Sequence, residues 1–137
     1  DTTPEIASKP EFVEYAKNIA MQVAAIVPNY VSEAEVPADV VEHEKKILTE
    51  QVVDSGKPAN VAEKIVEGRM KKFFKEICLL DQPYVKDGDM SVQQYTDATA
   101  KELGGDIKIK SFVRFEKGEG IEKREDNFAD EVANMVK

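Results

Sequence analysis

The sequence predicts an α+β fold in which helices pack on a small antiparallel sheet and one antiparallel helical hairpin projects from the body. Three observations support this class. Apolar residues recur at helical spacing through residues 40–77, and this pattern is interrupted once, by turn-forming residues at 54–58. A further helical pattern follows Pro10, and an alternating apolar and basic run at 107–115 is typical of a strand.

The composition describes one folded domain. The chain has 137 residues, of which 42% are hydrophobic and 34% charged, so it can bury a core and is too apolar for a disordered chain. A net charge of −8 argues against a dedicated nucleic-acid binder, because phosphate contacts need a basic face. Apolar runs are too short for a membrane span, and the polar start lacks a signal-peptide pattern. Because the first residue is not Met, we expect a processed form or a piece of a longer protein.

The N-terminal part should consist of an arm followed by a long helix. Residues 1–9 carry small polar residues and are predicted to form the arm. The helix should begin near Pro10, because proline is favoured in a first helical turn, and it should end before Pro28. A loop with one short helical turn is expected at 29–37. The apolar stripe of the helix comprises Phe12, Ala16, Ile19, Val23 and Ile26.

The projecting hairpin is predicted at 40–77. Its two helices carry apolar residues at helical spacing through VVEHEKKILTEQVV and NVAEKIVEGRMKKFFKEI. Gly56 follows the end of the first helix and Pro58 precedes the first turn of the second. Two helices joined by so short a turn should lie antiparallel. Gly68, within the second helix, costs about 1 kcal/mol relative to Ala and suggests close approach of another backbone.

The remainder of the chain, 78–137, should combine strands and helices. Residues 79–85 are predicted to be an extended segment that Pro83 confines to a sheet edge. Ser91 should cap a helix over 92–103, which a pair of glycines ends.

The run at 107–115 is the clearest strand in the sequence, because β-branched and aromatic residues alternate with charged ones. A final helix should span about 123–136. One strong strand and one doubtful strand are too few for an independent sheet. Either further strands precede Asp1 in a longer chain, or a second copy of the protein supplies a surface.

Residue types that carry catalysis or bind metals are scarce. His43, the only histidine, lies between two glutamates on the polar side of a helix, and we expect it to be solvated. Cys78, the only cysteine, cannot form an internal disulfide, which indicates a reducing compartment, and its position favours a buried, inert thiol. The glycine-containing turns lack the pattern of a phosphate-binding loop. We therefore expect no catalytic residue, no cofactor and no metal.

Two features suggest binding to a partner. The hairpin tip at 54–58 should project from the body, although solvated support of the fold is an equal alternative. The segment Gln82-Pro83-Tyr84-Val85 places an aromatic and a β-branched residue in irregular structure, where a contact role competes with packing into the core.

Several stretches resemble the translation elongation factor Ts family. They are AKNIAMQVAA, VPADVVEHEKKI, SGKP, AEKIVEGRMKKFFKE, QPYVKD, FVRFEKGEGIEK and DNFADEVA, in one order over about residues 9–137. The resemblance implies the core or dimerization domain of that family over 1–137, with a projecting coiled-coil hairpin. It implies a guanine-nucleotide exchange factor that binds elongation factor Tu, a GTPase, and promotes GDP release. We expect such a protein not to be an enzyme, because it turns over no substrate.

The resemblance also implies which residues meet the partner. Ser55 and Gly56 at the tip, with Tyr84 and Val85, resemble segments that contact the third domain of elongation factor Tu. The hairpin at 40–77 resembles a module that docks on a helix of the GTPase domain. A homodimer is an open alternative assembly, and neither nucleic acid nor a membrane is expected as a partner. The compartment would be the bacterial cytoplasm or the matrix or stroma of an organelle.

The sequence departs from the family at its start. Family members carry an N-terminal helical bundle, of which this sequence shows nothing, and a Thr-Asp-Phe-Val motif whose Asp and Phe wedge into the GTPase near its magnesium site. Here Thr3-Pro4-Glu5-Ile6 stands at the matching spacing, so Pro4 and Glu5 replace the expected pair. A binding or scaffold module with weak or no exchange activity is therefore the alternative function. An unrelated hydrolase or metal protein is a third possibility that no group of residues supports.

Overall fold

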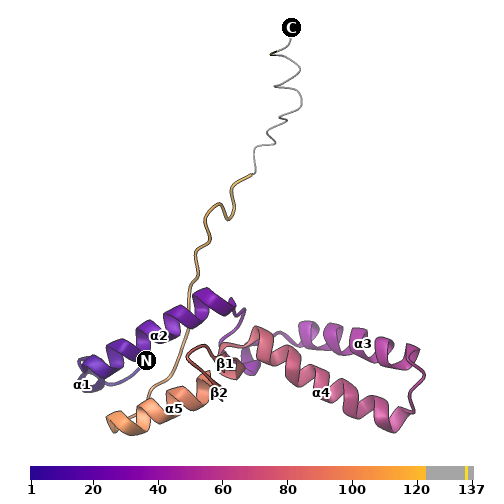
Figure 1. The fold of residues 1–137 in the computed structure, drawn as a ribbon, viewed down its shortest axis with the longest axis horizontal. Helices are drawn as coiled ribbons and strands as arrows, with labels where there is room; N and C mark the ends of the chain where they lie inside the picture. Colours follow the sequence, from indigo (N-terminus) through magenta and orange to yellow (C-terminus); the bar gives the residue numbers. More distant parts are fainter. Residues whose placement is uncertain (123–134, 136–137) are drawn as a thin grey trace.

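The computed structural model of the chain describes residues 1–122 and Met135. Figure 1 shows a body built from α1, α2, β1, β2 and α5, from which α3 and α4 extend side by side as a hairpin. The fold is α+β with a projecting antiparallel helical hairpin, as predicted. The elements in chain order are α1 (Pro4–Ala7), α2 (Pro10–Ile26), the 3₁₀-helix η1 (Glu33–Glu35), α3 (Ala38–Asp54), α4 (Ala59–Ile77), the 3₁₀-helix η2 (Leu79–Asp81), β1 (Pro83–Tyr84), β2 (Asp87–Ser91) and α5 (Val92–Leu103).

Residues 1–9, expected to form an arm, contain the short helix α1. Ile6 in this helix is buried, with 4% of its surface exposed. Its side chain lies so close to Gly105 that a Cβ there would clash with the Ile6 Cδ1 atom. The absence of a side chain at Gly105 therefore allows α1 to dock at the end of α5.

Helix α2 begins at Pro10, as predicted, but the prediction of its buried apolar stripe is partly wrong. Ile19 and Val23 are buried, whereas Ala16 is exposed and Ile26 is 46% exposed. Polar side chains of α2 are buried as well, because the body supplies hydrogen-bond partners for them. The Asn18 amide, for example, donates to the Tyr95 hydroxyl at 3.0 Å.

The end of α2 is tighter than the sequence suggests. Val27 adopts a left-handed conformation with φ 56° and donates its N–H to the Val23 carbonyl at 3.1 Å. The helix ends before Pro28, as predicted. The left-handed turn ends it abruptly and brings Pro28 into a buried position. Such a conformation is unusual for a β-branched residue.

The hairpin of α3 and α4 has an apolar core of its own. This cluster consists of Leu48, Val52, Ala62, Val66 and Met70. Gly56 in the connecting turn has φ 71°, which favours glycine, and Pro58 immediately precedes α4, as predicted. The close backbone approach expected at Gly68 is not found among the described residues, since nothing lies within 4 Å of the position of a Cβ there.

The body has a second apolar core between α2, η2 and α5. It consists of Tyr15, Ile19, Val23, Leu79 and Val92. This cluster shares no residue with the hairpin cluster. The described part of the molecule therefore has two separate apolar clusters, and the hairpin is connected to the body through the base of its helices.

The sheet differs from the predicted one. Residues 79–81 form η2 and are not extended, so only the Pro83–Tyr84 part of the expected segment is a strand. It pairs antiparallel with β2, which the sequence did not reveal because Asp87-Gly88-Asp89 is typical of a turn. Ser91 caps α5 as predicted: its Oγ accepts from the Gln94 N–H at 3.2 Å, and its own N–H donates to the Gln94 side chain at 2.9 Å.

The predicted strand at 107–115 is wrong as a sheet element. The segment is extended, but it pairs with no strand in the described part of the chain. Lys108 exchanges two backbone hydrogen bonds with Asp1, of 2.7 and 2.9 Å, and Phe115 is 92% exposed. A strand needs a neighbour for its N–H and C=O groups, and periodicity alone does not supply one. The final helix predicted at 123–136 lies outside the described residues, apart from Met135.

Candidate partner-binding surface

The hairpin tip presents small, exposed groups. Ser55 follows the last residue of α3, and both its N–H and its hydroxyl donate to the Val52 carbonyl. The Gly56 N–H donates to the Val53 carbonyl at 2.9 Å. Beside this turn Val53 is 60% exposed and Val61 is 42% exposed. The tip therefore offers a compact surface of backbone and apolar side chains, which suits contact with another protein.

Strand β1, which contains Tyr84 and is followed by Val85, lies at the other end of the hairpin, near its base (Figure 1). Tyr84 is only 5% exposed, and its ring stacks on Tyr95 with centroids 4.2 Å apart and planes inclined by 11°. Desolvation by burial, with the hydrogen bond and the charge of Tyr95, raises the pKa of the Tyr84 hydroxyl. Val85 is 42% exposed. Of this pair Tyr84 packs in the core, and Val85 is the one that reaches the surface.

A buried amide pair at the base of the hairpin was missed from the sequence. Gln22 and Gln82 are both completely buried. The Gln22 Nε2 group donates to Gln82 Oε1 at 3.2 Å and to the Pro83 carbonyl at 3.1 Å. The Gln22 Oε1 atom accepts from the Val85 N–H at 2.9 Å. One signal was available: Gln22 stands directly beside Val23, within the buried face of a long helix.

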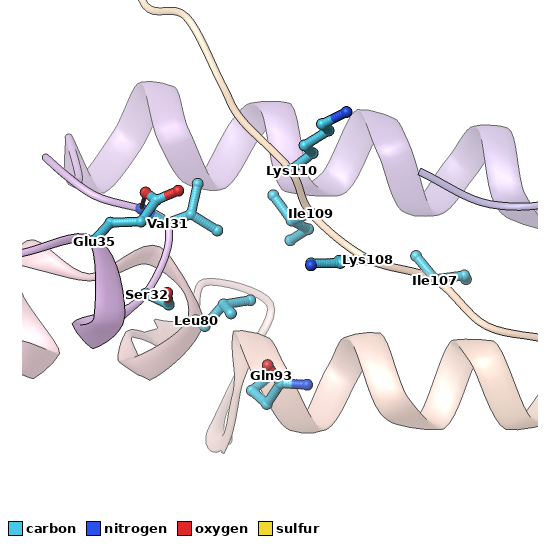
Figure 2. A pocket seen from close by; sticks show the side chains of 9 residues that line it. All are labelled: Val31, Ser32, Glu35, Leu80, Gln93, Ile107, Lys108, Ile109 and Lys110. Carbon is cyan, nitrogen blue, oxygen red and sulfur yellow. Dashed lines mark hydrogen bonds between the residues drawn. The ribbon is translucent and has the colours of Figure 1, made fainter.

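A cavity of about 450 Å³ lies beside this base, as Figure 2 shows. Its carboxylate, Glu35, already accepts a hydrogen bond from the Val31 N–H at 2.9 Å. The lining residues supply no nucleophile paired with a base, so the cavity has no arrangement for covalent catalysis. They are Val31, Ser32, Glu35, Leu80, Gln93, Ile107, Lys108, Ile109 and Lys110.

The single cysteine of the chain is not activated for chemistry. Cys78 is fully buried, and burial together with the charge of Asp81 raises its pKa to about 11. A thiol with so high a pKa is protonated and a poor nucleophile at neutral pH. His43 is exposed on α3, as expected. Among the described residues no cluster could hold a metal ion, and no helix is long and apolar enough to cross a membrane.

The family assignment follows from comparison with known proteins. The sequence model of the family described as Elongation factor TS matches residues 4–119, which is most of the chain. The chain belongs to the elongation factor Ts family. Among its relatives, elongation factor Ts of Acetivibrio thermocellus is 50% identical over 137 residues, covering 99% of this chain and 64% of the relative. Elongation factor Ts of Clostridioides difficile is 53% identical over 125 residues, covering 91% of this chain and 41% of the relative. The chain thus spans 41% to 64% of the length of these two elongation factor Ts proteins.

Membership of the elongation factor Ts family corrects one expectation. We expected the protein not to be an enzyme, because an exchange factor turns over no substrate. That expectation is wrong for elongation factor Ts, since an exchange factor speeds the release of a bound nucleotide and is itself recovered unchanged. This is catalysis by differential binding and requires no covalent step. The lack of a nucleophile and base pair among the described residues is therefore no argument against a catalytic role.

Proposed function

We propose that this chain is an exchange module that binds elongation factor Tu and accelerates the release of GDP from it. The observation that carries the proposal is the match to the Elongation factor TS family across residues 4–119. The projecting hairpin and the exposed Val85 beside its base support it, because they offer two separated contact points. Since the relatives are longer, the proposal assigns to this part an activity of the whole factor.

The driving force for exchange would be a difference in affinity. The module would bind the nucleotide-free GTPase more tightly than the GDP-bound form, so its binding favours loss of the nucleotide. By linkage, GDP weakens the binding of the module by the same factor. This mechanism needs shape and contact points and uses no acid, base or metal of the module itself.

We propose that Ser55, Gly56 and Val85 contact elongation factor Tu directly and that Tyr84 supports Val85. The first three are exposed. Tyr84 is enclosed against Tyr95, so it orients the strand from which Val85 emerges. A homodimer stays open as a separate assembly, and the interaction as proposed requires neither nucleic acid nor a membrane. The site of action would be the cytoplasm, or the matrix or stroma of an organelle, where translation takes place.

The alternative is a module that grips elongation factor Tu and promotes little exchange. Pro4 and Glu5 favour it, because both are exposed on α1 and neither offers an aromatic ring for insertion into a partner. Ile6, the apolar residue of this segment, is buried against the body. The exposed surface of α1 therefore offers no aromatic ring where the family resemblance implies a wedge.

The rate of fluorescent GDP release from elongation factor Tu, measured as the chain is titrated in, tests both functions. Acceleration of GDP release that saturates supports exchange, and binding without acceleration supports the alternative. If the chain neither binds nor accelerates release, both functions are contradicted. Val85→Lys should weaken the effect about tenfold, because a charge would be buried in the contact. Val113→Lys is the matched control, since Val113 is 74% exposed and belongs to neither contact point. If the lost wedge limits exchange, combining Pro4→Asp with Glu5→Phe should raise the maximal rate.

A further inference from the structure

The orientation of the hairpin depends on a narrow connection. Among the described residues the apolar clusters of hairpin and body share no residue, so neither cluster by itself determines the angle between them. One part of the connection is a short backbone ladder. The N–H groups of Asn29 and Tyr30 donate to the Ile77 carbonyl at 2.8 and 3.0 Å, and Leu79 and Leu80 donate to the Tyr30 and Val31 carbonyls at 2.8 and 3.0 Å. This ladder joins the chain entering the hairpin to the chain leaving it.

The second part of the connection is the Gln22–Gln82 pair. The Gln82 Nε2 group donates to the carbonyl of Glu76, in the last turn of α4, at 2.9 Å. Its Oε1 atom accepts from Gln22 on α2, which in turn holds the Val85 N–H. A chain of side-chain hydrogen bonds therefore runs from the hairpin through α2 to the segment that carries Val85.

Amides at these two positions are better suited to orientation than to stability. Hydrogen bonds have preferred directions, whereas apolar side chains of similar size would tolerate several packing angles. Both amides are fully buried, and no buried side-chain polar atom in the described part of the chain lacks a partner. A satisfied polar network of this kind restricts the surrounding elements to one arrangement.

Small rotations at this base would have large effects at the tip. Helix α4 has 19 residues, and at about 1.5 Å per residue it is roughly 28 Å long. A rotation of about 10° at the base would displace the tip by about 5 Å over such a length. Contacts at the tip and at Val85 can form together only if this displacement is prevented.

We propose that the buried Gln22–Gln82 pair is a positioning element that holds the α3–α4 hairpin at a fixed angle to the Val85 segment. Its expected effect on nucleotide exchange rests on the proposed function, whereas the fixed angle does not. Gln22 and Gln82 are positioning residues, because they act through the segments that they hold and contact no partner themselves.

The test compares Gln82→Met and the double variant Gln22→Met with Gln82→Met against the unmodified chain. Methionine keeps the approximate volume and removes the hydrogen bonds. Replacing both amides leaves the Val85 N–H and the Pro83 and Glu76 carbonyls without their side-chain partners, so the urea midpoint should fall by about 0.5 to 1.5 M while the chain still folds. Gln93→Met, at an exposed position of α5, is the matched control.

Orientation is measured by pulsed electron spin resonance between labels at Lys57→Cys on the tip and Lys101→Cys on α5, both exposed positions. We expect one narrow distance distribution for the unmodified and Gln93→Met chains, and in the double variant a distribution broadened or shifted by about 5 Å. A double variant whose urea midpoint falls by no more than about 1.5 M and which keeps the narrow distribution overturns the proposal. If the urea midpoint of the double variant falls far below the original, the distance distribution of Gln82→Met decides instead. In this single variant Gln22 keeps its bonds to Pro83 and Val85, and an unchanged distance distribution also overturns the proposal.

The exchange assay separates this proposal from the proposed function. For unlabelled chains, the concentration of the double variant that gives half-maximal GDP release should rise about tenfold, while Gln93→Met leaves it unchanged. If the unmodified chain causes no release, the proposed function fails, and the distance distributions alone decide the positioning role. If the distribution broadens while the half-maximal concentration stays the same, the part of the proposal that concerns exchange is overturned.

Discussion

Leu79→Ala should strongly destabilise the body of the protein. Leu79 is fully buried and packs with Val23 of α2 and Val92 of α5. The substitution removes three buried carbon groups. At about 0.8 kcal/mol each, the lost burial free energy is about 2.4 kcal/mol. A residual cavity of about 60 Å³ would add about 1.4 kcal/mol, because helices on both sides limit collapse. We therefore expect a loss of about 4 kcal/mol in the free energy of unfolding.

Urea denaturation followed by circular dichroism measures this loss. With a slope of about 2 kcal/mol per molar urea, the midpoint should fall by about 2 M. Val113→Ala is the control, because Val113 is 74% exposed and its truncation should change stability by less than about 0.5 kcal/mol. A loss below about 1.5 kcal/mol for Leu79→Ala would refute the argument, since it would mean that Leu79 is not enclosed by α2 and α5.

Three further predictions concern single groups. Ser91→Ala removes the acceptor of the Gln94 N–H and should lower the unfolding free energy by about 1 kcal/mol in urea titrations, and Ser91→Asp should restore most of it. Because burial raises the pKa of Cys78 to about 11, a thiol reagent at neutral pH should modify the native chain far more slowly than the urea-unfolded chain; equal rates would contradict this. Desolvation, followed by the charge of Asp81, raises the pKa of Glu33 in the folded chain, so between the unfolded and the folded pKa the folded state binds more protons than the unfolded state. Stability should consequently fall as the pH rises from the usual glutamate range through the raised pKa, and Glu33→Gln should make urea midpoints less dependent on pH there.

Local sequence patterns predicted the helices well. The hairpin followed from apolar spacing on both sides of a turn that contains Gly56, and α5 followed from its Ser91 cap. These features depend on residues within a few positions of each other, so spacing is sufficient to find them. The same holds for the family, because its motifs are short runs that stand in one order along the chain.

Strands were predicted less well, because a strand depends on a neighbour that local sequence does not specify. The run at 107–115 alternates as a strand should, yet in the described structure only Lys108 of this run pairs with another backbone segment, through Asp1. Strand β2, by contrast, contains turn-forming residues and pairs because β1 lies alongside it. Cross-strand partners, and not β-propensity, decided both cases.

The features of the candidate surface also separate into those that the sequence predicts and those that only the tertiary structure decides. Sequence alone determined that a hairpin exists, that Ser55 and Gly56 form its turn, and that reactive side chains are scarce. Only the tertiary structure decided that Tyr84 is enclosed while Val85 is exposed, and that Gln22 meets Gln82 across 60 positions of sequence. The physical reason is that burial and hydrogen-bond partnership belong to pairs of segments brought together by folding, whereas helix and turn formation depend on neighbouring residues.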